Sequence, residues 1–234
     1  MFDLAIFGQH LFNGLLIGCA YALIAIGLTM IFGVMNIANF AHGEFYMIGG
    51  FFAFYLVSLA KINYFLALPL AVALVVVLAV VIQQLVFKRL RDAPVMTTTL
   101  VTIGLSILLE NLAHLLWGAQ PQTVPNPFPT SPMSFAGIYT TPLYLFSMAM
   151  TAALIVVGHV LIQRTRMGKA MRATFQNKEA AALVGIRIDS IYLYAFGFGA
   201  ALAAAAGAIL GGFIPVEPTM GGVATLKALS LIHI

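Results

Sequence analysis

Long uninterrupted hydrophobic runs dominate the polarity pattern of this chain. Each run is about 20 residues long, which is the length of α-helix that crosses a hydrocarbon core of roughly 30 Å. Runs such as residues 66–82 lack the alternation of polar and apolar positions that marks a transmembrane β-strand. The pattern therefore predicts six membrane-spanning helices, at residues 10–33, 43–60, 64–87, 95–117, 143–163 and 191–214.

The composition supports the same class. Hydrophobic residues make up 62% of the 234 positions and charged residues 8%, whereas a soluble domain has about 25% charged residues. A water-soluble chain of this size would lack the polar surface needed to cover its core. We therefore expect an all-α, polytopic integral membrane protein whose residues 1–234 form a single transmembrane domain in the lipid bilayer. Nothing in the composition indicates nucleic-acid binding.

The basic residues predict the orientation of the helices. Nine of the 11 Lys and Arg residues fall in two segments, residues 88–91 and 164–190. Cytoplasmic loops are enriched in such residues, so both segments are expected to face the cytoplasm. Residues 118–142, which carry no charge and six prolines, would then form a rigid external loop without a long helix. The same count places the N-terminus outside.

The longest polar stretch, residues 164–190, has the composition of an ordered loop. Residues 169–184 contain good helix formers and no proline, and they predict one helix. Gly185 follows at the position where a glycine commonly ends a helix.

Four polar side chains gather between the first two predicted spans: Asn36, Asn39, His42 and Glu44. Ionisable groups near the bilayer are costly and usually face a cavity or a partner. These residues therefore belong either to a re-entrant element that lines a translocation path, or to a tight turn whose side chains cap helix ends. A metal site formed by His42 and Glu44 is not expected, because further ligands are missing.

Two sequence patterns are similar to known permeases. Glu179-Ala180-Ala181 with Gly185 resembles the EAA-x-x-x-G coupling segment of ABC importer permeases. The run from Gly14 to Gly50 resembles the branched-chain amino-acid permease family. Similarity recurs at residues 176–186 and, more weakly, at 196–212 and 218–227.

The resemblance implies a permease subunit of an ABC importer that moves branched-chain amino acids across the bacterial cytoplasmic (inner) membrane. It implies three kinds of protein partner: ABC ATP-binding subunits, a second permease subunit and a soluble solute-binding protein outside the membrane. The chain has no P-loop motif, so the resemblance implies a transport subunit rather than an enzyme, with no cofactor of its own. The residues expected to couple it to the ATPase are Arg172, Gln176, Glu179, Ala180, Ala181 and Gly185.

Two alternatives remain open at this level: an ABC permease for another small polar solute such as urea, and an ion-coupled secondary transporter. The family has two paired permeases of different length. Because this chain has no long N-terminal extension, it resembles the shorter one more closely. Family members continue for several spans beyond the position of Lys227, and residues 229–234 do not resemble that continuation. The resemblance therefore implies a chain that is incomplete at its C-terminus.

Overall fold

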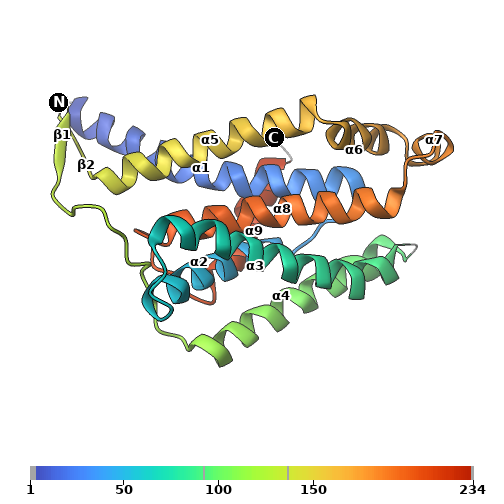
Figure 1. Cartoon of the computed structure of the whole chain (residues 1–234), viewed down its shortest axis with the longest axis horizontal. Coiled ribbons are helices and arrows are strands. Elements are labelled where there is room, and N and C mark those ends of the chain that lie inside the picture. The colour runs from blue at the N-terminus through green and yellow to red at the C-terminus, as the bar shows by residue number, and fades with distance from the viewer. Residues whose placement is uncertain (1–3, 92, 136, 233–234) are drawn as a thin grey trace.

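The computed structural model describes residues 4–91, 93–135 and 137–232, and almost all of its regular structure is helical (Figure 1). The helices are α1 (Leu4–Met35), α2 (His42–Ser58), α3 (Tyr64–Leu85), the 3₁₀ helix η1 (Phe87–Leu90), α4 (Val95–Trp117), α5 (Pro142–Arg164), α6 (Arg166–Gln176), α7 (Lys178–Leu183), α8 (Ile188–Leu210) and α9 (Met220–Ile232). A short antiparallel hairpin, β1 (Met133–Phe135) and β2 (Ile138–Thr140), lies in the loop before α5.

The predicted all-α polytopic class is confirmed. Five helices, α1, α3, α4, α5 and α8, are long and apolar enough to cross a membrane. The predicted span at 43–60 corresponds to α2, a helix of 17 residues that is buried over most of its length. The expected count of about six therefore consists of five long helices and one shorter internal helix.

Helix α8 lies at the centre of the bundle, with α1, α2 and α3 packed around it (Figure 1). Buried residues make up 72% of the most apolar stretch of α8, but only 17% of the corresponding stretches of α4 and α5. The latter two helices therefore have most of their surface free to contact lipid or another subunit. Figure 1 shows α4 diverging from the rest of the bundle.

Glycines on α8 let neighbouring backbones approach closely. A Cβ added to Gly207 would overlap the carbonyl oxygen of Tyr46 in α2. A Cβ on Gly199 would lie 2.7 Å from the carbonyl oxygen of Gly27 in α1. Within lipid, the hydrophobic effect does not drive helices together. Helix faces made of small residues instead allow the close dispersion contacts that hold the helices to one another. By contrast, Gly14 and Gly18 of α1, which have the same i, i+4 spacing, meet nothing within 4 Å.

The two ends of the bundle differ in structure. The hairpin and the proline-rich loop lie at one end, and η1, α6 and α7 lie at the other (Figure 1). The expectation of one helix over 169–184 was wrong. The chain becomes extended at Asn177, and the side chain of Asn177 accepts a hydrogen bond from the backbone N–H of Ala180, which starts a separate helix. Gly185 adopts a φ of 86°, as expected for a glycine that ends a helix.

Replacing Gly207 by valine is expected to destabilise the bundle. The new side chain would overlap the α2 backbone, and overpacking typically costs about 1–3 kcal/mol. The measurement is the temperature at which the detergent-purified protein loses its monodisperse size-exclusion peak. Gly104→Val is the matched control, because Gly104 of α4 meets nothing within 4 Å. Equal stability of the two variants would contradict the close approach of Gly207 to the α2 backbone.

Candidate functional site

The connection between α1 and α2 turns back into the bundle. Asn36 has a positive φ of 55°, which ends α1, and residues 36–39 have no regular structure. Helix α2 begins at His42, whose Nε2 lies 3.2 Å from the carbonyl oxygen of Ile24. Ile24 lies well inside α1, about three helical turns before its C-terminal end. The first turn of α2 is therefore inside the bundle rather than at its surface.

Helix α9 meets α2 at this internal position. The backbone N–H of Gly43 donates a 2.9 Å hydrogen bond to Oγ1 of Thr225, which in turn donates to the carbonyl oxygen of Gly221 at 3.0 Å. A Cβ on Gly221 would overlap the carboxylate of Glu44. The first turn of α2 and the N-terminal half of α9 thus form a tight joint, which we call the α2–α9 joint.

The joint contains fully buried polar side chains. Asn39, His42 and Glu44 each have 0% exposure. Ser106 of α4 donates a 2.7 Å hydrogen bond to Oε1 of Glu44, and Oδ1 of Asn39 accepts from the N–H of Ala41 at 3.1 Å. Nδ2 of Asn39, Nδ1 of His42 and Oε2 of Glu44 have no hydrogen-bond partner among the described residues. Buried polar atoms are usually paired, so this grouping calls for a functional explanation.

The structure combines features of both sequence-based alternatives for this segment. Asn39 supports a local turn, yet the segment also re-enters the bundle and carries Glu44 to the α2–α9 joint. Asn36 is separate from the other three predicted residues, because it is exposed and lines a cavity at the end of the bundle.

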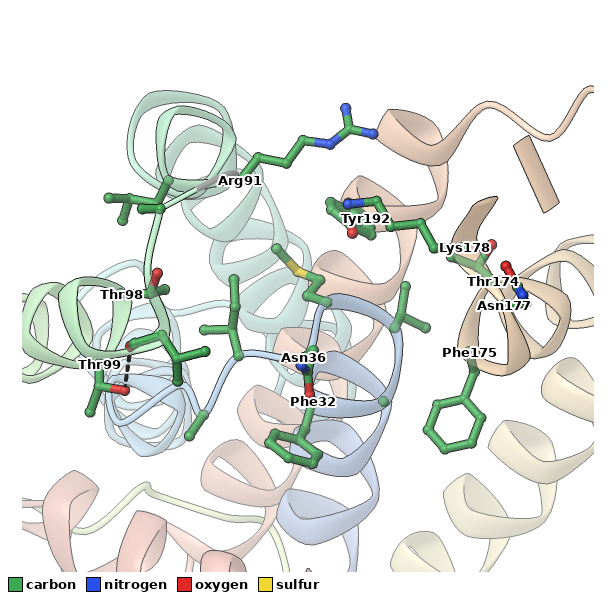
Figure 2. A pocket seen from close by; sticks show the side chains of 18 of the residues that line it. Phe32, Asn36, Arg91, Thr98, Thr99, Thr174, Phe175, Asn177, Lys178 and Tyr192 are labelled. Carbon is green, nitrogen blue, oxygen red and sulfur yellow. Dashed lines mark hydrogen bonds between the residues drawn. The ribbon is translucent and has the colours of Figure 1, made fainter. Parts of the chain in front are cut away.

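That cavity has a volume of about 460 Å³ and lies between the C-terminal end of α1, the segment from η1 to the start of α4, and the α6–α7 junction (Figure 2). Its wall includes several polar side chains: Asn36, Arg91, Thr98, Thr99, Thr174, Gln176, Asn177, Lys178 and Tyr192. Its size is typical of small-molecule sites. The cavity thus joins the re-entrant segment to the loop that resembles a coupling element.

Two basic side chains converge on one aromatic ring beside the cavity. The ammonium of Lys178 lies 5.5 Å, and the guanidinium of Arg91 5.4 Å, from the centre of the Tyr192 ring (Figure 2). Arg91 also forms an ion pair with Asp189. These contacts connect the start of α7, the end of η1 and the first turns of α8 through cation–π and ionic attraction.

Helix α6 contacts α1 directly through an aromatic side chain. A Cβ on Gly33 would lie 2.6 Å from two ring atoms of Phe175, so the ring rests on the glycine near the end of α1. The α6–α7 segment is thus in contact with the helix that leads into the re-entrant segment.

The predicted coupling residues occupy different environments. Glu179, Ala180 and Gly185 are exposed, whereas Ala181 is buried and holds α7 against the body. Arg172 is only partly exposed and donates a hydrogen bond to the backbone carbonyl of Ile162 near the end of α5. Gln176 is exposed and lines the cavity.

Sequence reasoning missed the two most prominent apolar residues of the loop. Leu183, the last residue of α7, is 88% exposed, and Val184, which follows it, is 77% exposed. Large apolar side chains at such exposure outside the long apolar helices are candidates for a protein contact. The sequence feature that could have identified them is that they are two consecutive large apolar residues within the longest polar stretch of the chain.

These features define a polytopic α-helical membrane protein with a polar joint inside its bundle and a helical loop at one end. The sequence profile of the family described as "Branched-chain amino acid transport system / permease component" matches residues 10–230. The chain therefore belongs to this family of transport permeases, and its five long apolar helices agree with a multi-pass membrane protein.

Individual relatives agree with this assignment. The chain is 33% identical to the high-affinity branched-chain amino acid transport system permease protein LivH of Salmonella typhimurium, over 96% of this chain and 77% of that protein. It is 34% identical to LivH of Escherichia coli K12 with the same coverage of both chains. It is 31% identical to BraD of Pseudomonas aeruginosa over 95% of this chain and 76% of the relative. No solved structure matches significantly.

Replacing Thr225 by valine is expected to weaken the α2–α9 joint. Valine has a similar shape, but it leaves the buried N–H of Gly43 without its acceptor, which costs about 1–3 kcal/mol. The expected result is a lower temperature of unfolding for the detergent-purified protein. Thr225→Ser is the control, because it keeps the hydroxyl. If valine and serine were equally stable, the hydrogen bond would not hold the joint together.

Proposed function

We propose that this chain is a membrane permease subunit of an ABC importer for branched-chain amino acids. Membership of the permease family over residues 10–230 carries this proposal. The relatives named LivH and BraD are branched-chain amino acid permeases, and the same solute class is proposed here. The ATP-binding subunits, a second permease subunit and a soluble solute-binding protein are the proposed partners.

The proposed contact with the ATPase is the exposed tip formed by Glu179, Ala180, Leu183, Val184 and Gly185. Leu183 and Val184 supply the apolar anchors, and Glu179 with the nearby basic residues supplies charge that orients the encounter. Gly185, with its φ of 86°, lets the chain leave α7 sharply and return toward α8. A short protruding helix suits insertion into a groove of a partner.

Movement of this tip would reach the membrane helices along two contacts. Phe175 packs on Gly33 near the end of α1, and Lys178 lies over the Tyr192 ring of α8. Both contacts are close to the cavity that Asn36 lines. ATP binding would favour one arrangement of these helices only if the ATPase contacts differ between the two arrangements. We propose that the re-entrant segment and the α2–α9 joint respond to that change.

The proposed translocation path involves Asn36, Asn39, His42 and Glu44. Asn36 would lie at its cytoplasmic end, in the cavity wall, and the other three at the α2–α9 joint inside the membrane. The proposed orientation has the N-terminus outside and the α6–α7 loop in the cytoplasm of the bacterial cell. The proline-rich segment before α5 would then face the solute-binding protein.

Leu183→Glu is expected to reduce co-purification of the ATP-binding subunits by about tenfold or more, because it places a charge where an apolar anchor docks. The measurement is the amount of ATPase retained per permease after affinity purification from membranes. Leu59→Glu is the matched control: Leu59 is 71% exposed at the opposite end of the bundle.

Both variants must first insert into the membrane in the same amount as the parent. Loss of the ATPase with Leu183→Glu alone supports the coupling role of the tip. Retention of the ATPase with both variants would rule out the Leu183 contact. A parent protein that never retains an ATPase would instead indicate a transporter that works without one.

A further inference from the structure

The proline-rich loop before α5 is tied to the connection between α8 and α9. The backbone N–H of Gln122 donates a 2.9 Å hydrogen bond to the carbonyl oxygen of Val216, and the N–H of Val216 donates one of 2.7 Å to the carbonyl oxygen of Gln122. The N–H of Val124 donates a further hydrogen bond of 2.7 Å to the carbonyl oxygen of Gly211, which follows α8. We call this set of paired residues the loop clamp.

The loop clamp lies inside the bundle, although most loops run over the surface of a protein. Val124 and Val216 both have 0% exposure. A Cβ on Gly50 of α2 would lie 2.9 Å from Cγ2 of Val216, and a Cβ on Gly211 would lie 2.8 Å from Cγ2 of Val124. The two valines are therefore packed tightly against α2 and the end of α8, so packing as well as hydrogen bonds fixes the clamp.

A short, folded link leads from the loop clamp to the α2–α9 joint. It runs from Val216 to Met220, where α9 begins. The backbone N–H of Met220 donates a 3.3 Å hydrogen bond to the carbonyl oxygen of Glu217, so the link is a closed turn. The next residue, Gly221, packs against the carboxylate of Glu44. A displacement of Val216 therefore reaches the joint with little slack.

The proline-rich loop is also attached to α1. Nε2 of Gln9 donates a 3.0 Å hydrogen bond to the carbonyl oxygen of Tyr139 in β2, and Oε1 of Gln9 accepts one of 2.7 Å from the Tyr139 N–H. Between this attachment and the loop clamp the chain contains four prolines, at positions 125 to 132. Proline restricts φ and stiffens the chain. A contact made on this stiff segment therefore displaces its attachments instead of being absorbed by the loop.

We propose that the loop clamp transmits docking of the solute-binding protein on the proline-rich loop to the α2–α9 joint. This inference rests on the proposed function, because the binding protein is a partner of that importer. Gln122 and Val216 are positioning residues: they couple the start of α9, and with it the contact between Gly221 and Glu44, to the docked loop. Docking favours one arrangement of the joint because the binding protein contacts the loop differently in the two arrangements.

The α2–α9 joint then lies between two inputs. The tip that contacts the ATPase reaches α1 through Phe175, which rests on Gly33. The loop clamp reaches α9 from the opposite end of the bundle. Coupling between two sites acts in both directions. ATP hydrolysis by the partner ATPase is therefore expected to respond to the docked binding protein, and to do so only while the clamp and its link are intact.

The test measures ATP hydrolysis by the complete importer in proteoliposomes with and without leucine-loaded binding protein, and takes the ratio of the two rates. Val216→Pro removes the N–H that donates to Gln122, whereas Val216→Ala removes side-chain packing and keeps the N–H. Val216→Pro is expected to bring the ratio close to one, a loss of about fivefold or more, and Val216→Ala to stay within about twofold of the parent. A purely structural defect would lower both rates together and preserve the ratio.

A second variant leaves the loop clamp unchanged and alters only its link to α9. Two glycines inserted between Glu217 and Pro218 lengthen the link by up to about 7 Å and make it flexible, so docking no longer displaces α9. The same insertion between Lys61 and Ile62, in the loop between α2 and α3, is the matched control. Only the insertion before α9 is expected to bring the ratio close to one, with an unchanged rate in the absence of binding protein and unchanged subunit content.

A disulfide tests the geometry of the loop clamp. Gln122 and Val216 exchange both backbone hydrogen bonds, and residues paired in this way have Cα atoms about 5.5 Å apart, a distance that a disulfide spans. With Cys19→Ser as the background, Gln122→Cys combined with Val216→Cys is expected to form the disulfide under mild oxidation. The oxidised importer is expected to keep the ratio of its reduced form, because the clamp stays closed.

Three results would overturn the inference. A ratio like that of the parent in both Val216→Pro and the insertion before α9 would mean that docking reaches the ATPase by another route. A cysteine pair that does not cross-link would contradict the pairing of Gln122 with Val216. Loss of stimulation on oxidation would mean that the clamp has to open during transport and does not transmit docking as a closed unit.

Failure of the proposed function would look different. In that case the parent importer itself would not respond to any leucine-loaded binding protein, or would not assemble with an ATPase. The proposed partners would then be wrong, and the role of the clamp would fall with them. Failure of the inference alone leaves the parent stimulated and the variants stimulated to the same extent.

Discussion

Close contact between the backbones of α8 and its neighbours is the interaction on which the rest of the structure depends. Gly199 and Gly207 remove the side chains that would keep α1 and α2 at a distance, and the alanines between them keep the face of α8 shallow. Within lipid, helices do not gain the hydrophobic drive that assembles soluble bundles, so dispersion between close surfaces must replace it. The resulting core of α1, α2, α3 and α8 is closely packed, while α4 and α5 remain largely free at its edge.

Side-chain hydrogen bonds explain how the break between α1 and α2 is tolerated inside the bundle. A break between α1 and α2 exposes backbone N–H and C=O groups, which must be paired internally where no water is present. Thr225 pairs with the N–H of Gly43, and Asn39 pairs with the N–H of Ala41. The joint thus replaces the missing helical hydrogen bonds with side-chain partners. It also brings Glu44 and the start of α9 into one place, against the inner part of α1.

The α6–α7 loop shows how much of a local structure can be predicted from the local sequence. Helical structure in this loop and the glycine at its end agree with expectation. The division into α6 and α7 was missed, because an asparagine can either continue a helix or cap a new one, and its surroundings decide between these roles. The burial of Ala181 and the exposure of Leu183 could not be predicted from the local sequence either, because they depend on how α7 packs against α8.

The sequence alone determined the class of protein, the approximate positions of the long helices and the group of polar residues between the first two, because these depend on residue polarity and on the thickness of a membrane. Tertiary structure decided which of those residues are buried together. Asn36 lines a cavity, whereas Glu44 is enclosed by Ser106 and Gly221, and Lys227 lies beside Tyr21 from the other end of the sequence. Contacts of this kind join positions up to 206 residues apart. They follow from the close packing of helices in space, which no local pattern of hydrophobicity records.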